Sequence, residues 1–413
     1  MEIQFFFPQK GSTCDLYVTI CDEISNTNLR FRTFLTINKD QWDIITQRPK
    51  NPYLKLSKAI NTKMDTIRLC ILEAYKRKKP VSARTMARLI KNISLEKQHN
   101  YPEESFLGFM QQYIASRKPI ICASTHKRYM VFFRLLERFQ GRIIRRLMID
   151  DINHNFIRDF IDFGKSEEYS DNTVYRTIHF VKTILNYAER KGVRTYVREL
   201  EIRKGTQRRD MITLSEDELE NIRTCDVPNE LVEAKKWLLI SCYTGQRISD
   251  FMQFSREKLT KINGIECVSF IQKKTRKEIT LPLHPAVIEI VRQNGGDFPA
   301  SIDTGLYNTQ IKEIARLAGL RHQIKAKKRI GYRTKTILTE KWEMLTSHIG
   351  RRSFATNFYG KIPTPLLMEA TGHSTEQMFL KYINRMDNNK IISLSGYFNQ
   401  TYESQQKINF SNR

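Results

Sequence analysis

Thr244-Gly245-Gln246-Arg247-Ile248-Ser249-Asp250 directly follows the most apolar uncharged run of the chain, residues 237–243. Four further short stretches, far apart in the chain, carry functional side chains of related kinds. They are Lys274-Thr275, His348-Ile349-Gly350-Arg351, Gly372-His373 and Lys381-Tyr382. A protein that cuts a phosphodiester without a metal needs such groups, because fixed cations hold the phosphate charge and a hydroxyl serves as nucleophile. The set therefore indicates a DNA strand transferase.

The net charge of the chain points to the kind of partner. Its 413 residues are enough for two or three domains, and a hydrophobic content of 40% fits a folded protein. Lysine and arginine number 69 against 44 acidic residues, which gives a formal charge of +25. Such an excess indicates a polyanionic partner, and nucleic acid is the first expectation.

The sequence predicts neither a membrane span nor a secretory signal. The apolar run at 237–243 is far too short to cross a bilayer, and the longer uncharged run at 105–116 contains Gln111 and Gln112. The N-terminal residues 1–8 lack a basic flank and a small-residue cleavage site. We therefore expect a cytoplasmic protein without a membrane partner.

Cysteine and glycine patterns give no sign of a metal or a cofactor. The seven cysteines are odd in number and form no Cys-x-x-Cys pair, which fits unpaired thiols in a reducing compartment. No two of them lie at the spacing of a zinc finger. A glycine-rich phosphate loop followed by Lys-Ser/Thr is also missing from the sequence. We therefore expect no metal and no cofactor.

Residues 1–95 are predicted to form a small β-α module. Two segments rich in β-forming residues, 16–20 and 29–37, predict strands, and apolar residues at helical spacing predict a helix at about 53–75. The basic run at 76–79 follows this helix. A DNA-binding role and a solvated charge run explain that run about equally well.

The segment 104–192 is predicted to be a helical domain. Apolar stripes at helical spacing, at 105–115 and 171–191, indicate core rather than contact surface. Lys127 and Arg128 supply cations suited to phosphate contacts, although exposed cations are usually only solvated. A basic linker at 193–210, which includes Arg208 and Arg209, is suited to lie along a DNA backbone.

The region 211–390 is predicted to be a compact third domain, followed by a tail at 391–413. Ser215 and Glu218 form a capping-box pattern at the start of a helix. Segments 267–271 and 278–283 flank a basic polar stretch and predict a β-hairpin. The strongly basic segment 321–341 permits no assignment. The expected fold class is a multidomain chain that is mainly α with small β elements.

The motifs of residues 211–386 together resemble the catalytic domain of the tyrosine recombinases, also called phage-type integrases. Residues 244–250 are similar to the first arginine motif of that family, and His348-Ile349-Gly350-Arg351 matches its His-x-x-Arg. Tyr382, nine residues after His373, matches the closing His-to-Tyr pattern. Each motif alone is weak, but the joint match is strong.

The other two domains also resemble parts of this family. The helical segment is similar to the core-site-binding domain, and the N-terminal module more loosely resembles the arm-site-binding domain of integrases from bacterial mobile elements. The resemblance implies integration and excision of an element, with double-stranded DNA bearing core and arm sites as partner. It further implies a homotetramer on DNA, with the tail packing on a neighbour, and allows an accessory DNA-bending or excision factor.

The chemistry of the motif residues agrees with this resemblance. Attack of a tyrosine hydroxyl on a phosphate builds negative charge, which the planar guanidinium groups of Arg247 and Arg351 can meet with paired hydrogen bonds. Tyr382 is the expected nucleophile and forms a 3′-phosphotyrosine. We expect His348 to accept or steer its proton and His373 to donate a hydrogen bond to the phosphate.

A lysine and an aspartate complete the predicted site. By the resemblance, Lys274 protonates the departing 5′ oxygen, with Lys273 and Lys277 as close rivals. Asp250 lies three residues after Arg247, so both share a helix face, and it is expected to orient the site. A surface ion pair explains Asp250 about as well.

Two other functions compete with recombination. A type IB topoisomerase-like enzyme would use similar side chains but act as a monomer that relaxes supercoils. A non-enzymatic DNA-binding regulator explains the charge of +25 equally well. The regulator, however, gives no reason for the combined Tyr, Arg, His and Lys set.

Overall fold

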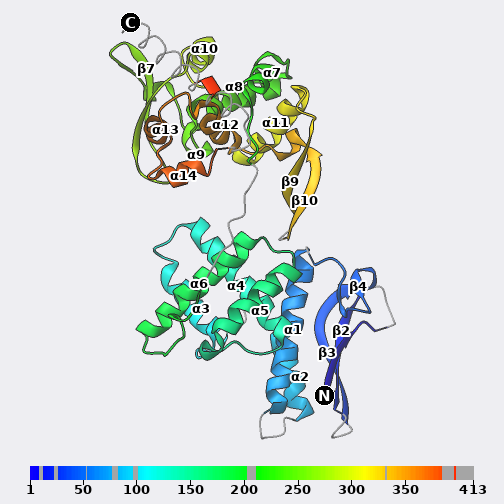
Figure 1. The fold of residues 1–413 in the computed structure, drawn as a ribbon. Coiled ribbons are helices and arrows are strands. Elements are labelled where there is room, and N and C mark those ends of the chain that lie inside the picture. The colour runs from blue at the N-terminus through cyan, green and yellow to red at the C-terminus, as the bar shows by residue number, and fades with distance from the viewer. Residues whose placement is uncertain are drawn as a thin grey trace. The chain divides into compact units, whose positions relative to one another are not determined.

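The computed structural model describes residues 1–8, 13–22, 27–52, 54–76, 82–95, 101–201, 211–330, 333–383 and 395–396. Two compact units make up the chain, Met1–Gly205 with Arg329–Lys335 and Thr206–Lys328 with Thr336–Arg413. Helices predominate and the sheets are small, which confirms the predicted fold class (Figure 1). None of the helices in the described ranges has the length and apolar character that a bilayer span requires.

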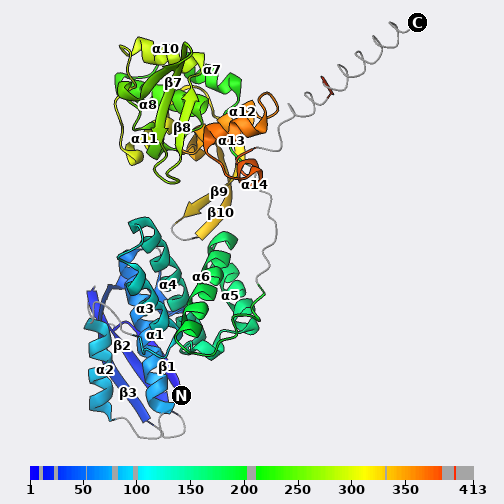
Figure 2. The same ribbon diagram turned by 90° about the vertical axis from the view of Figure 1, so that its left-hand side faces the viewer.

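The first unit begins with a three-stranded antiparallel sheet backed by two helices. The strands are β1 (Glu2–Phe6), β2 (Thr13–Asp22) and β3 (Thr27–Asn38), and the helices are α1 (Lys55–Lys76) and α2 (Ala83–Leu95). Alternating side chains of the strands, such as Val18 opposite Phe31, are buried in one core with the apolar faces of both helices. Figure 2 shows the two helices beside the sheet. The predicted strands and helix of the N-terminal module are therefore confirmed. Two short strands, β4 (Trp42–Asp43) and β5 (Arg48–Pro49), pair beside them.

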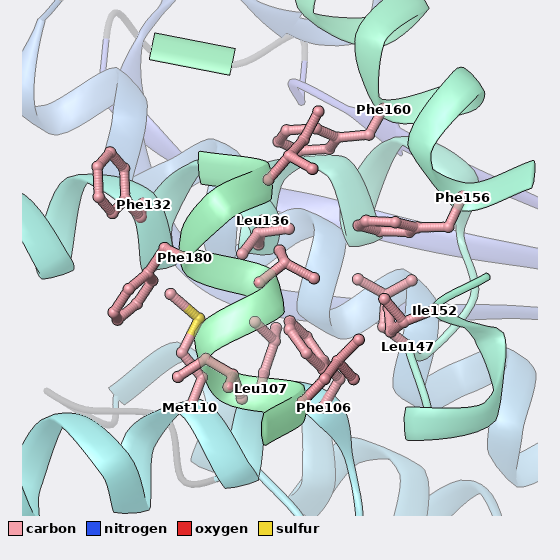
Figure 3. Packing of buried hydrophobic residues seen from close by; sticks show 14 of the residues in the cluster. Phe106, Leu107, Met110, Phe132, Leu136, Leu147, Ile152, Phe156, Phe160 and Phe180 are labelled. Carbon is pink, nitrogen blue, oxygen red and sulfur yellow. The ribbon is translucent and has the colours of Figure 1, made fainter. Parts of the chain in front are cut away.

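Helices form the next part of the first unit, up to residue 190. They are α3 (Phe106–Arg117), α4 (Ala123–Ile143), α5 (His154–Ser166) and α6 (Asp171–Arg190), with a 3-10 turn at Ile149–Asp151. Their core is rich in phenylalanine, including Phe106, Phe160 and Phe180 (Figure 3). Burial of each such side chain contributes roughly 1.5–3 kcal/mol to stability. The two predicted apolar stripes thus lie in the core, as expected.

The N-terminal module and this helical segment contact each other directly. The guanidinium of Arg146 donates from Nε and Nη2 to the two carboxylate oxygens of Glu73, at 2.6 and 2.7 Å. Gly141 of α4 lies so close to Asp65 of α1 that a Cβ there would meet its side chain at 2.5 Å. The two predicted domains therefore share one compact unit, and the boundary between 95 and 104 stays a prediction.

The second unit packs helices around a small sheet. The helices are α7 (Glu216–Thr224), α8 (Asn229–Thr244), α9 (Ile248–Phe251), α10 (Pro285–Gln293), α11 (Thr304–Leu317), α12 (Ile349–Phe358), α13 (Thr364–Thr371) and α14 (Glu376–Leu380). Short 3-10 turns lie at Arg256–Lys258 and Lys341–Met344. Ser215 and Glu218 form the predicted capping box at the start of α7.

Two antiparallel sheets are formed by segments between residues 259 and 340. The three-stranded sheet orders β6 (Leu259–Ile262), β7 (Ile265–Ile271) and β8 (Glu278–Pro282). Strands β7 and β8 are the predicted hairpin, and β6 was not predicted. The segment that permitted no assignment forms a second hairpin, β9 (Gln323–Ile330) and β10 (Arg333–Glu340).

Two glycines allow the close approach that builds the site. Gly350 lets α12 pack on α8, because a Cβ at this position would lie 2.1 Å from Ser241 Oγ. Gly245 ends α8 with a φ of +66°, and a Cβ there would lie 2.5 Å from the ring of Phe354. As a result, Arg351 at the start of α12 lies beside the end of α8.

Some predicted features fall outside the described residues. They are Arg208 and Arg209 with the linker part 202–210, residues 77–79 of the basic run, and the tail 391–413 apart from 395–396.

Candidate active site

The first arginine lies at the N-cap of α9, where the chain leaves the left-handed turn at Gly245. Arg247 Nη1 donates to Gln272 Oε1 at 3.3 Å and lies 3.9 Å from Asp250 Oδ2. The Asp250 side chain has no exposed surface, and its Oδ1 accepts from the backbone N–H of Lys273 at 2.9 Å. Asp250 thus lies within ion-pair distance of Arg247, and it also anchors the turn before Lys274.

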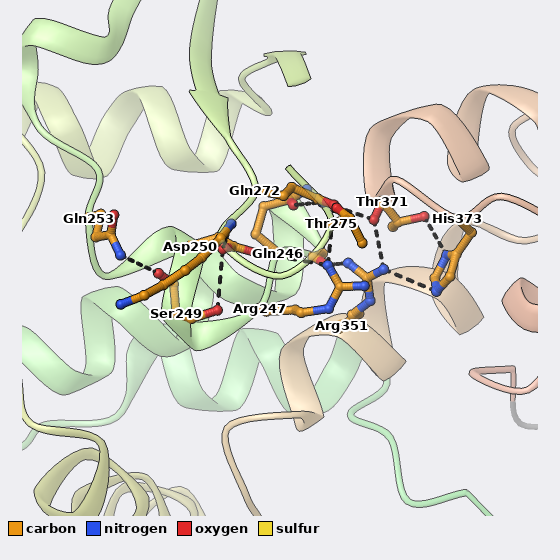
Figure 4. A network of polar contacts seen from close by, with 12 residues as sticks. Gln246, Arg247, Ser249, Asp250, Gln253, Gln272, Thr275, Arg351, Thr371 and His373 are labelled. Atoms are coloured by element: carbon orange, nitrogen blue, oxygen red, sulfur yellow. Dashed lines mark hydrogen bonds and ion pairs between the residues drawn. The ribbon is translucent and has the colours of Figure 1, made fainter. Parts of the chain in front are cut away.

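The second arginine is fully buried and held by backbone carbonyls. Arg351 donates from Nη1 to the Gly245 carbonyl at 3.0 Å. Its Nη2 donates to the Thr371 carbonyl at 2.7 Å (Figure 4). Nη2 also lies 3.0 Å from His373 Nε2. A guanidinium has five N–H donors, and these contacts use three. Nε, among the described residues, has no hydrogen-bond partner.

The contacts of His373 assign its protonation. Because Arg351 can only donate, His373 Nε2 accepts, and the ring proton lies on Nδ1. Nδ1 then donates to Thr371 Oγ1 at 2.8 Å, and that hydroxyl donates in turn to the Leu367 carbonyl. Burial, followed by the charges of Arg351 and Arg247, lowers the pKa of His373 to about 3. His373 is therefore neutral at pH 7 and orients Arg351.

Tyr382 lies against this pair just after α14. Its ring centroid is 4.9 Å from that of His373 and 5.3 Å from Arg351 Cζ. Burial, and next the charge of Arg247, lowers the pKa of Arg351 to about 10, while Tyr382 acts in the opposite direction. Two guanidinium groups and a phenol therefore share one partly desolvated, positively charged site, which suits a phosphate at the point of attack.

His348 and Lys274 lie at the exposed side of the site. His348 is the N-cap residue of α12, and Lys274 lies in the exposed turn between β7 and β8. Partial desolvation and then the cations Arg352, Arg351, Arg247 and Lys274 lower the pKa of His348. The imidazole is therefore neutral at pH 7 and able to accept a proton. Lys277, one rival of Lys274, donates to Ser374 Oγ at 3.2 Å.

The structure brings most of the predicted residues together. Arg247 lies beside Asp250, and Arg351, His373 and Tyr382 contact one another. The charge of Arg247 acts on Arg351, and the charges of both arginines and of Lys274 act on His348. Lys127 and Arg128 are exposed in the first turns of α4, in the other unit. Among the described residues, no group of three His, Cys, Asp or Glu side chains could hold a metal ion.

Sequence reasoning missed the residues that connect these groups. Gln272 and Gln246 are fully buried, and Gln272 Nε2 donates to Gln246 Oε1 at 3.2 Å and to the Thr371 carbonyl at 3.1 Å. Their only signal is position, because Gln246 directly precedes Arg247 and Gln272 precedes the Lys273-Lys274-Thr275 turn.

The lowered pKa of His373 predicts a loss of stability in acid. Unfolded histidine binds a proton near pH 6.5, whereas the folded ring resists it down to about 3. The unfolding free energy should therefore fall as the pH drops from 6.5 toward 3, by at most ~1.4 kcal/mol per pH unit from this group. Urea titrations of the wild type and of His373→Gln at pH 7 and pH 5 measure it, and equal pH dependence of the two would contradict it.

Two family models match the chain, one within the helical part of the first unit and one over most of the second unit. Residues 105–196 match the phage integrase SAM-like domain, and residues 213–389 match the phage integrase family. No curated protein matches the chain significantly.

Solved structures show the same fold at low sequence identity. An arginine-to-lysine variant of the Tn1549 transposon integrase, in complex with a circular intermediate DNA, is 14% identical with a TM-score of 0.51 over 72% of this chain and 99% of that chain. The XerH site-specific recombinase bound to a palindromic difH substrate in a post-cleavage complex is 14% identical, with a TM-score of 0.50 over 83% of this chain and 96% of that chain. The chain belongs to the phage integrase family, the tyrosine recombinases, which carry out site-specific DNA recombination.

Proposed function

We propose that the chain cuts and rejoins double-stranded DNA through a 3′-phosphotyrosine at Tyr382, for integration and excision of a mobile element. The observation that carries the residue assignment is the convergence of Tyr382, His373 and Arg351, with ring and guanidinium separations of 4.9 and 5.3 Å. The similarity to a transposon integrase in complex with circular intermediate DNA supports the mobile-element role.

The phosphate is held by the two guanidinium groups. Arg351 keeps two N–H donors beyond those that bind Gly245, Thr371 and His373. Arg247 can offer its fork while Asp250 and Gln272 hold it in place. Because these donors are preorganised, charge that develops on the non-bridging oxygens is stabilised without reorganising the site.

Cleavage then exchanges one ester for another. The Tyr382 hydroxyl oxygen forms a bond to phosphorus while the bond from phosphorus to the deoxyribose 5′ oxygen breaks. His348 accepts the phenol proton and Lys274 gives a proton to the departing 5′ oxygen. Attack by a 5′ hydroxyl of the same or another strand reverses the step and releases Tyr382. His373 could donate to the phosphate only if its ring exchanged its present partners when DNA binds.

The DNA partner carries core sites and arm sites in this proposal. The exposed cations Lys127 and Arg128 on α4 would contact the backbone of the core site, and Arg208 and Arg209 would add phosphate contacts. A homotetramer supplies the four strand cuts of one exchange. An accessory bending or excision factor would set the direction.

Covalent capture tests the proposal. Sheared DNA from cells that carry the gene is incubated with the protein, and fragments that stay attached in detergent are sequenced to define the site. A duplex of that site, nicked just beyond the cleaved bond, should then accumulate a covalent adduct. Two marked copies of the site should recombine. Relaxation of supercoils without recombination would favour a type IB topoisomerase-like enzyme, and no adduct would favour a regulator.

A further inference from the structure

Gln272 uses every hydrogen-bonding position of its side-chain amide inside the protein. The residue has no exposed surface and directly follows β7. Its Oε1 accepts from Arg247 Nη1 at 3.3 Å and from Thr275 Oγ1 at 2.6 Å. Its Nε2 makes the two donations to Gln246 and Thr371 described above. The amide orientation is unambiguous, because a flipped amide would set N–H groups against the guanidinium and an oxygen against the Thr371 carbonyl.

These bonds connect the two arginines with the turn that carries Lys274. The Thr371 carbonyl that accepts from Gln272 also accepts from Arg351 Nη2. Gly372 approaches so closely that a Cβ there would lie 2.5 Å from Gln272 Oε1. One buried amide therefore contacts Arg247 directly and Arg351 through a shared carbonyl.

Lys274 is bracketed by a hydrogen bond on either side. Before it, the Lys273 backbone N–H donates to Asp250 Oδ1 at 2.9 Å; after it, Thr275 Oγ1 donates to Gln272. The backbone of Gln272 also closes the turn, with its N–H donating to the Lys277 carbonyl at 2.8 Å and its carbonyl accepting from Arg276 N–H at 2.9 Å. An exposed turn gains a fixed position only through such anchors.

We propose that Gln272 is a positioning residue that, through Thr275, holds Lys274 in register with the phosphate bound by Arg247. The inference rests on the proposed function, because it assigns Gln272 to the protonation of the departing 5′ oxygen. Arg247 and Arg351 have further partners, Asp250 for the first and Gly245 and His373 for the second. Loss of the Gln272–Thr275 bond should therefore disturb the lysine more than the phosphate contacts.

A substrate that needs no leaving-group proton tests this role. The probe is the captured site as a nicked duplex, made once with its ordinary phosphodiester and once with sulfur in place of the bridging 5′ oxygen. A thiolate leaves without protonation, because a thiol is a far stronger acid than an alcohol. Single-turnover adduct formation is measured for both duplexes with Thr275→Val and Gln272→Met, at saturating protein.

Both variants should slow cleavage of the ordinary duplex by about tenfold or more and cleave the sulfur duplex within about threefold of wild type. Lys274→Ala should show the same rescue after a larger loss, about 10²–10⁴. Thr280→Val is the matched control, since it removes a hydroxyl that meets Ser269 Oγ at 2.9 Å on the same hairpin. It should leave both rates unchanged.

The outcomes separate this inference from the proposed function. Thr275→Val alone can overturn the positioning role, even if Gln272→Met fails to fold. It does so if its cleavage rate falls equally on both duplexes, or if its rate on the ordinary duplex does not fall. If Lys274→Ala is rescued while Thr275→Val is not, only the role of Gln272 fails. If the wild type forms no adduct with either duplex, the proposed function itself fails.

Discussion

Replacing Tyr382 with phenylalanine is expected to abolish covalent adduct formation and recombination while DNA binding stays intact. Removal of a catalytic nucleophile costs on the order of 10⁶ in rate, which puts the variant below detection. The ring contacts with His373 and Arg351 need no hydroxyl, so the phenylalanine can occupy the same place. The measurement is the detergent-resistant protein–DNA adduct on the nicked duplex, together with a gel-shift titration of the same DNA.

A second tyrosine of the same small cluster provides the control. Tyr359 packs with Tyr382 around Phe379 and Ile383. Tyr359→Phe also removes one phenol, and it should still form the adduct. If Tyr382→Phe forms the adduct at the wild-type rate, the nucleophile is another tyrosine. Tyr397 and Tyr402, which lie outside the described residues, would then be tested next.

Local sequence patterns predicted the elements whose stability is local. The capping box of Ser215 and Glu218 and the alternation in β2 and β3 each act within a few residues, so they can be read without the rest of the fold. The second hairpin was different. Burial is described for residues 321–328 and 335–341, and among these only Ala326 and Thr339 are buried, so these stretches lack the apolar alternation that identifies a strand. Pairing between β9 and β10 fixes these strands.

The site was predictable in its residue types but not in its connections. Arg247, His348, Arg351, His373 and Tyr382 could be named because their motifs resemble those of the tyrosine recombinases and because such side chains suit phosphoryl chemistry. Gln272 could not be named, because its role depends on a carbonyl 99 positions away and on the hydroxyl of Thr275. The hydrogen-bond partners of this buried amide come largely from other segments of the chain, so the sequence around Gln272 does not predict them.

The tautomer of His373 shows the same limit. A histidine in this motif suggested a hydrogen-bond donor to phosphate. In the fold, its Nε2 accepts from Arg351 and its Nδ1 donates to Thr371, so the ring acts on the arginine. Tertiary contacts therefore determine which ring nitrogen of His373 donates and which accepts. The motif predicts only that an imidazole is present.

Arg351→Lys is expected to reduce the rate of adduct formation by about 10²–10³ at saturating protein, although the charge is conserved. The guanidinium spans two fixed carbonyls, those of Gly245 and Thr371, and reaches His373 from the same nitrogen as Thr371. One ammonium cannot span these partners and still offer two donors to a phosphate. Single-turnover rates separate this effect from weaker DNA binding.

Arg316→Lys, in the surface pair with Glu313, is the matched control and should cleave normally. A folded Arg351→Lys protein that cleaves at nearly the wild-type rate would refute the assignment, because phosphate stabilisation would then require only a positive charge and not a fork held in place by the backbone.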